Sequence, residues 1–349
     1  MYRINTLRRL ALAATLLAFC VVVFGAYVRV TDAGLGCPDW PGCYGHVTPT
    51  GAVAAASSAA TDPGAAQAPI HVGKAWREMI HRYIASTLGL IIVVIAGLSL
   101  WWRRQPGVPR GLPWVLVALV IFQGLLGMWT VLHKVNPLTV TLHLVFGLTT
   151  LSVLWWLWVD LRRLGNSPWA GVPAGGGSAA ALLRRAPAFV RRVALIGLIA
   201  LALQILLGGW TSTNYAATAC PDFPRCQAAW WPEANFRDAF VPWRGLGVNY
   251  EGGVLAPASR VAIHFTHRLG AIVATLALLF AALSAWRVRR DTHGRWAAGV
   301  VVLALGLQLI IGISMVLQGF PVWLATAHNA GAALLLLATL ALNRALRRI

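Results

Sequence analysis

The chain has 349 residues, of which 58% are hydrophobic and 11% charged, with a formal net charge of +19 and a mean hydropathy of +0.68. So apolar a composition excludes a soluble globular domain and indicates a lipid bilayer as the surroundings. The positive charge does not indicate a nucleic-acid partner, because the arginines lie in short clusters between apolar runs, as topology signals do.

Eight apolar runs are long enough to cross a bilayer, which predicts an all-α integral membrane protein with eight transmembrane helices. The runs are 10–29, 80–102, 113–132, 138–159, 190–210, 261–285, 296–317 and 322–342. The first run resembles a signal peptide, but no clear small-x-small cleavage site follows it and its counterpart recurs in mid-chain. We therefore interpret it as the first span.

Most lysines and arginines fall at the two ends of the chain and in the loops 102–112, 160–192 and 286–295. The positive-inside rule then predicts that both termini are cytoplasmic. The start of the chain shows no amphipathic, Arg- and Ser-rich presequence, which favours a bacterial cytoplasmic (inner) membrane over an organellar one.

The chain repeats itself at a nearly constant offset. Cys37-Pro-Asp-Trp-Pro-Gly-Cys43 returns as Cys220-Pro-Asp-Phe-Pro-Arg-Cys226, His81-Arg82 returns as His267-Arg268, and Gln123, Gly127 and His143 return as Gln308, Gly312 and His328. The pattern predicts two tandem four-helix bundles related by parallel duplication. We place the first half at 1–164, a cytoplasmic linker at 165–189 and the second half at 190–349.

Four histidines form two matched pairs, His81 with His143 and His267 with His328. Each lies one to two turns inside the outer end of a predicted span, so all four share one depth, roughly 5–10 Å below the outer surface. A single membrane histidine more often forms a helix–helix hydrogen bond. Four at one depth instead favour axial ligation of haem iron from opposite faces.

Glu78 lies three residues before His81, on the same face of a predicted helix. It is either a solvated charge at the helix end or a functional group, since ionisable residues in membrane helices are commonly functional. The second half has His264 at the equivalent position, and its role is open between a proton or electron path and packing. Because only the first half carries a carboxylate, we place proton-transfer chemistry there and electron supply in the second half.

The two cysteine loops lie on the predicted outer side, where disulfides persist. A structural disulfide within each loop, Cys37–Cys43 and Cys220–Cys226, is the favoured interpretation. A zinc site and, for the first loop, a redox relay are the alternatives. Cys20, within the first span, is expected to be a small buried residue.

Three predicted helices carry a glutamine four residues before a glycine. These pairs are Gln123 with Gly127, Gln204 with Gly208, and Gln308 with Gly312. We assign them a packing role, because the glycines permit close helix approach and the glutamines can form hydrogen bonds across helices.

Together, the Glu78-x-x-His81-Arg82 motif, the partner histidines and the paired cysteine loops resemble the heme A synthase family over nearly the whole chain. The resemblance implies that heme O is oxidised at its C8 methyl to a formyl group by successive hydroxylation, which gives heme A. It also implies the site: His267 and His328 hold a resident haem b, His81 and His143 bracket the substrate porphyrin, Glu78 is catalytic, and Cys37–Cys43 is the family's disulfide.

Arg82 and Arg268, next to the ligands, are candidate contacts of haem propionates, or they only extend to the interface. The implied partners are the heme O synthase that supplies the substrate, cytochrome oxidase assembly as acceptor of the product, and an electron donor that no motif identifies. Two rival functions remain: a di-haem b-type electron-transfer cytochrome without substrate chemistry, and a transporter in which His and Glu carry protons.

Overall fold

The structure is a computed structural model, and it describes residues 2–51, 53–54, 71–165, 186–245, 247–288 and 292–347. Eight of its helices are long and apolar enough to cross a membrane. Within the described residues the elements are all helices, with two isolated β-bridges in loops. The predicted all-α class with eight spans is confirmed, whereas most of the predicted linker 165–189 lies outside the described residues.

The helices follow the chain from one apolar run to the next. They are α1 (Tyr2–Val30), α3 (Val72–Trp101), α4 (Leu112–Leu132), α5 (Pro137–Gly165), α6 (Ala188–Thr213), α7 (Phe236–Ala239), α8 (Pro257–Val288), α9 (Thr292–Leu317) and α10 (Val322–Arg347). Most extend beyond their predicted runs, because an apolar run marks only the part of a helix suited to the hydrocarbon core. α3, for example, begins eight residues before the predicted run.

Two of the helix starts are explained by local sequence. α5 begins at Pro137, directly after Asn136, whose side-chain oxygen accepts the N–H of Leu138 at 3.0 Å. Asparagine is a favoured N-cap, and proline fits the first helical position because its missing N–H has no partner there anyway. α8 likewise begins at a proline, Pro257. These prolines start helices that carry two of the four histidines.

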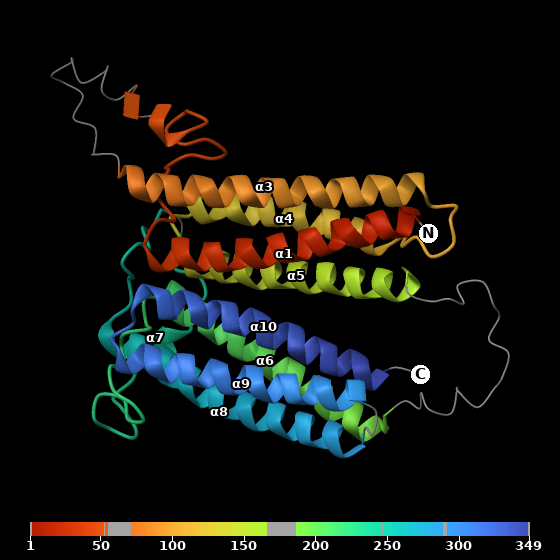
Figure 1. Ribbon diagram of the computed structural model, residues 1–349. Coiled ribbons are helices and arrows are strands. Elements are labelled where there is room, and N and C mark those ends of the chain that lie inside the picture. The colour runs from red at the N-terminus through yellow and green to blue at the C-terminus, as the bar shows by residue number, and fades with distance from the viewer. Residues whose placement is uncertain are drawn as a thin grey trace.

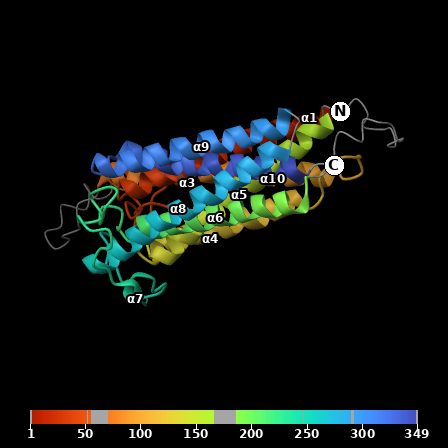
Figure 2. The ribbon, with the colours of Figure 1, turned by 90° about the horizontal axis from the view of Figure 1, so that it is seen from below.

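The long helices run roughly side by side (Figures 1 and 2), and their contacts divide them into two groups, one above the other in Figure 1. In the first group, α1 and α4 each contact both α3 and α5; in the second, α6 and α9 each contact both α8 and α10. The groups meet where α1 contacts α10 and α5 contacts α6. One continuous cluster of buried leucine, isoleucine, valine and alanine runs through both groups.

Polar contacts connect the two groups at the end where the cysteine loops lie. Arg29 donates to the carbonyl of Ser212 at 2.6 Å and to the Asp32 carboxylate at 3.2 Å. Tyr215 donates its hydroxyl hydrogen to Asp32 at 2.9 Å, and its ring stacks under the Arg29 guanidinium. At the opposite end, Arg344 forms an ion pair with Asp160. The two groups are therefore linked at both ends as well as through their apolar core.

Both termini lie at one end of the molecule, and the two cysteine loops lie at the other (Figure 1). The short helix α7 lies at the same end as the cysteine loops. It is held there by the Trp210 indole, which donates to the carbonyl of Ala239 at 2.9 Å. Cys20 is exposed on the surface of α1, so the expectation that it is buried was wrong. Hydropathy could not predict which side of α1 is exposed, because apolar residues lie all around this helix.

Candidate functional site

The two cysteine loops have the same construction. Disulfides join Cys37 to Cys43 and Cys220 to Cys226. In the first loop the Asp39 carboxylate accepts the N–H groups of Tyr44 and Gly45 at 2.6 and 2.8 Å. Asp222 accepts those of Gln227 and Ala228 at 2.7 and 2.8 Å in the second. The predicted disulfides are confirmed, and zinc ligation by these cysteines is excluded because all four sulfurs are already bonded.

Beneath the first loop lies Glu78, which is 6% exposed. One carboxylate oxygen accepts the N–H of Cys37 at 2.9 Å, and the other accepts from the Arg82 guanidinium at 2.5 Å. The interpretation of Glu78 as a solvated helix-end charge was therefore wrong. A carboxylate with few water contacts needs such partners, because an unpaired buried charge is costly.

His264 takes the same place beneath the second loop. It is 4% exposed, and its Nδ1 accepts the N–H of Cys220 at 3.2 Å. A neutral imidazole has one acceptor nitrogen only, so this bond leaves the proton on Nε2, which lies 3.4 Å from Nε of Arg268. A carboxylate can serve both the loop and the arginine, whereas His264 can serve only the loop.

Arg82 and Arg268 bind the loops to the helices that carry the histidines. Nη1 of Arg82 donates to the carbonyls of Asp39, Pro41 and Gly42 at 2.9, 3.2 and 2.5 Å. Arg268 donates to the carbonyls of Arg225 and Cys220, both at 2.8 Å. These contacts give both arginines a structural role in the loops, and their contact with haem propionates stays a prediction.

Each of the four paired histidines lies against a glycine of a neighbouring helix. The pairs are His81 with Gly25, His143 with Gly127, His267 with Gly208, and His328 with Gly312. A Cβ on Gly25 would lie 2.7 Å from Nε2 of His81, and one on Gly312 would lie 2.9 Å from Cε1 of His328. Such distances are too short for any side chain, so these glycines make room for the imidazoles.

Three glutamines hold the backbone of the histidines. Gln123, Gln204 and Gln308 each donate to the carbonyl of the facing histidine at 3.0 Å. The predicted hydrogen bonds across helices are confirmed, and the histidine is identified as the partner. On α1, the residue four before Gly25 is Val21, and His81 instead forms a hydrogen bond with the Val21 backbone. Sequence reasoning missed Gly25 because no glutamine marks it.

The helices that carry each histidine pair lie diagonally in their group. Among the described residues, α3 and α5 are separated by α1 and α4 and make no substantial contact, and α8 and α10 make only a few contacts. The imidazoles of His81 and His143 nevertheless lie close enough to interact electrostatically, as do those of His267 and His328. Each pair thus presents two imidazoles to one another across the interior of a four-helix group.

This arrangement fits haem ligation. All four imidazoles are half-buried, and Nδ1 of His143 is buried without a hydrogen-bond partner among the described residues. Neutral imidazoles from opposite sides are the donor set that axial haem ligation needs. In the described ranges no three His, Cys, Asp or Glu side chains come together, so the histidines offer ligands in pairs.

Comparisons with known proteins agree over nearly the full length. The family model described as cytochrome oxidase assembly protein matches residues 8–340. A protein named heme A synthase from Shewanella oneidensis is 41% identical over 344 residues, which cover 98% of this chain and 96% of the relative. A heme A synthase from Rhizorhabdus wittichii is 29% identical over 97% of this chain and 93% of its own length. The chain belongs to the cytochrome oxidase assembly protein family.

Proposed function

We propose that this protein is a heme A synthase that oxidises the C8 methyl group of heme O to a formyl group. Its coarser role, as an oxidoreductase enzyme of heme A biosynthesis, follows from the family and from a relative of that name at 41% identity. The finer proposal is that His81 and His143 bracket heme O while His267 and His328 hold a resident haem b. Because the relatives are named heme A synthases, the rival interpretation of the chain as a transporter is not pursued.

One observation carries this proposal. The two histidine pairs lie at equivalent positions of the two helix groups, and among the described residues only the first pair has a buried carboxylate beside it. Glu78 is one helical turn from His81, whereas the second half has His264 in that position. A site that only passes electrons needs no carboxylate. A site where a methyl group loses hydrogen needs a group that accepts protons or balances positive charge.

Haem, when bound, supplies the redox-active iron, and the protein contributes orientation and electrostatics. His81 and His143 would hold the substrate ring from opposite sides. Glu78 would take up or release a proton at a carboxylate oxygen, and Arg82 would balance its charge when it is ionised. The Cys37–Cys43 disulfide packs on Ala75 and Met79 of α3, so the loop keeps water from this end of the helix.

A second candidate, a di-haem electron-transfer cytochrome, is favoured by one contact. Glu78 and His264 form the same bond to the first cysteine of their loops, so Glu78 could serve only to hold the loop. The two functions differ in what the purified protein contains. A synthase carries haem b together with heme O or heme A, whereas the cytochrome carries two equivalent haems that do not react.

The direct test is the extraction and identification of haems from the purified protein and two variants. His267→Ala is expected to lose haem b and its low-spin spectrum, and to make no heme A because it has no route for electrons. His81→Ala is the matched control, which should keep haem b and lose heme O or heme A. Haem b retained in His267→Ala, or lost from His81→Ala with the second site intact, would overturn the assignment of the two halves.

We also propose that the cysteine-loop end faces the outside of a bacterial cytoplasmic membrane, with both termini inside and the haem sites near the outer face. Lys and Arg clustering supports this orientation, and the two ends differ as it requires (Figure 1). Reporter fusions at Arg104 should report cytoplasm, and those at Gly252 the outer side. Reversal of either signal contradicts the orientation and the proposed depth of the histidines.

A further inference from the structure

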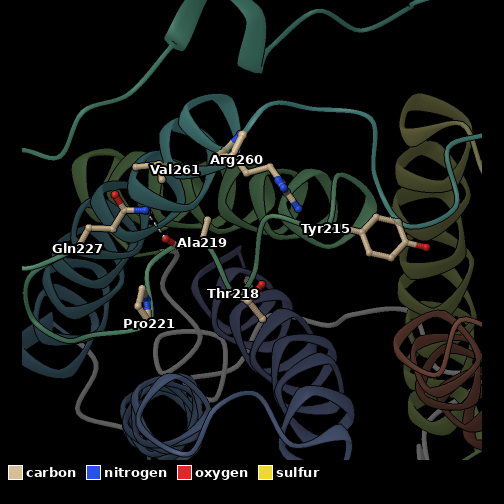
Figure 3. Close-up of a pocket in the computed structure, with 8 residues that line it drawn as sticks. Tyr215, Thr218, Ala219, Pro221, Gln227, Arg260 and Val261 are labelled. Carbon is tan, nitrogen blue, oxygen red and sulfur yellow. Dashed lines mark hydrogen bonds between the residues drawn. The ribbon is translucent and has the colours of Figure 1, made fainter.

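Arg260 lies in the first turn of α8 and lines a cavity of about 330 Å³ at the cysteine-loop end. Thr218 and Gln227 share the lining and supply polar groups, whereas the Tyr215 hydroxyl points away from Arg260 and donates to Asp32 (Figure 3). The Arg260 side chain extends from its helix over the cavity toward Tyr215 (Figure 3). The cavity lining therefore combines one cation with two hydrogen-bonding side chains.

The position of Arg260 relates it to His267. The two residues are seven apart on α8, so they share a face within about 20° and are separated along the axis by about 10.5 Å. This separation is comparable with the reach from a haem iron to its propionate carboxylates. Arg268, by contrast, is adjacent to His267 and points to another face of the helix.

The guanidinium of Arg260 also has no ion-pair partner in the described part of the chain. No side-chain hydrogen bond to it is found within the described ranges either. Arg268 differs, because its guanidinium is held by two loop carbonyls. A guanidinium at the edge of a polar cavity is suited to a carboxylate or phosphate, which it can bind through two parallel hydrogen bonds.

The first half has Lys74 at the equivalent position, seven residues before His81 on α3. Its ammonium lies 3.7 Å from the carboxylate of Glu251, which belongs to the outer loop of the second half. Both side chains are more than a third exposed, and exposed ion pairs of this kind contribute little to stability. Glu251 can therefore give way to another carboxylate.

We propose that Arg260 and Lys74 are the residues that bind haem propionates at the outer end of the two sites. The proposal rests on the proposed function, since it assumes haem at His267 and at His81. Arg260 holds the carboxylate of the resident haem through its planar, permanently charged group. Lys74 holds that of the substrate as a point charge, and Glu251 competes for it, so that the product can be released.

The test for the resident haem is Arg260→Gln, which keeps hydrogen-bonding capacity and removes the charge. Purified protein should retain haem b about tenfold less firmly during competition with an apo-haem acceptor. The haem b midpoint potential at pH 8 should fall, because an unbalanced propionate stabilises ferric iron. The potential should also gain a pH dependence, because loss of the cation raises the propionate pKa. The matched control is Arg237→Gln, an exposed arginine of α7 at the same end, which should change neither property.

A lipid phosphate is the other source of a suitable anion, and haem dimethyl ester separates the two. Reconstitution with the ester should lower retention by the wild type to that of Arg260→Gln, and the ester should bind both proteins equally. If Arg260→Gln weakens acid and ester haem alike, Arg260 does not act through the propionates and the proposal is wrong. Unchanged retention and potential in Arg260→Gln would overturn it too. A wild type without haem b would instead contradict the proposed function.

For the substrate site, Lys74→Gln and Glu251→Gln should act in opposite directions. Lys74→Gln should lower the amount of heme O or heme A that co-purifies, while haem b stays. Glu251→Gln should raise that amount, because the competing carboxylate is gone. Equal effects of the two variants would overturn the competition between Glu251 and the propionate.

Discussion

The two halves have the same helix arrangement and equivalent cysteine loops, but they differ at three positions around the proposed haem ligands. In the first half, Glu78 forms an ion pair with Arg82, Val21 faces His81 and Lys74 is paired with Glu251. The corresponding residues of the second half are a neutral imidazole, a glutamine and an arginine that has no ion-pair partner in the part of the chain that the structure describes. They are His264, Gln204 and Arg260.

The difference between the halves is consistent with a resident haem in the second half and a reacting haem in the first. The second half provides more contacts that fix the histidine: Gln204 approaches both the ring and the carbonyl of His267. Among the described residues of the first half, His81 has a backbone hydrogen-bond partner and no glutamine, and a carboxylate lies nearby. A resident cofactor gains from rigid ligands, whereas a substrate that must enter and leave gains from fewer fixed contacts.

The variant Glu78→Gln tests this difference between the halves and is expected to have the largest effect on heme A formation. Glutamine can still accept the N–H of Cys37, so the loop should stay in place while the ion pair with Arg82 and the proton exchange are lost. Heme A formation should fall by about 10²–10⁴-fold, the typical contribution of a general acid–base group. Heme O should accumulate and the haem b spectrum should stay unchanged. His264→Gln, the matched control, should be much milder, and a normal rate in Glu78→Gln would reduce Glu78 to a structural residue.

Gly270→Ala tests the glutamine of the second half. The added Cβ would lie 2.4 Å from Oε1 of Gln204 and 2.9 Å from Cδ1 of Leu207, and overpacking of this kind costs about 1–3 kcal/mol. The variant should bind haem b more weakly, because Gln204 is pushed away from His267. Measurement is by haem b content per protein and by thermal unfolding.

Removal of the clash gives the control for this prediction. Adding Gln204→Ala to Gly270→Ala should recover part of the lost stability, since the small side chain leaves room for the new methyl group. The first half has Ile84 at the equivalent position, where no glycine accommodates a glutamine. Equal haem b retention in wild type and Gly270→Ala would show that Gln204 does not position His267.

The disulfides are expected to have a smaller effect, and a different one in each half. Replacing Cys220 and Cys226 by serine removes a cross-link of short sequence separation and should cost about 2 kcal/mol of stability, with heme A formation largely kept. The same change at Cys37 and Cys43 should cost similar stability and also lower activity, because the Cys37 N–H positions Glu78.

Thermal unfolding and heme A formation measure the two effects separately. Thiol labelling of the denatured, oxidised protein should modify Cys20 alone, and four further thiols should appear on reduction. Four reactive thiols without reductant would contradict both disulfides.

The smallest expected effect concerns α7, which lies in the segment between α6 and α8. The Ser259 hydroxyl at 2.7 Å and the Arg244 guanidinium at 2.8 Å lower the pKa of Asp238. A carboxyl with a lowered folded-state pKa stabilises the fold above its unfolded value of about 3.9, and this stabilisation is lost as pH falls through the folded pKa. Ser259→Ala should therefore let α7 open at a higher pH during acidification.

Hydrogen exchange of the segment 235–240 as a function of pH measures this change. The haem b spectrum of Ser259→Ala should not differ from that of the wild type. An unaltered exchange profile would mean that Asp238 does not hold α7.

Much of this architecture could be predicted from the sequence. Eight runs of apolar residues predicted the eight spans, and the recurrence of Cys37, His81 and His143 at a nearly constant offset predicted equivalent positions in the second half. These signals are read from the sequence directly, because hydropathy and helical spacing depend on residues near one another in the chain, and a repeat is found by comparing two stretches of the same sequence. The disulfides and the equivalence of Glu78 and His264 could be predicted for the same reason.

The tertiary structure decided which side chains meet between helices, because those contacts depend on how each helix is rotated about its axis. Arg82 and Arg268 were candidate propionate contacts or interface residues, and the structure adds bonds to loop carbonyls that the sequence did not predict. Cys20 lies on the exposed side of a helix whose sequence is apolar all round. Gly25 and the Lys74–Glu251 pair join segments far apart in sequence. Hydropathy records how deep a residue lies in the membrane, and only packing decides which way it faces.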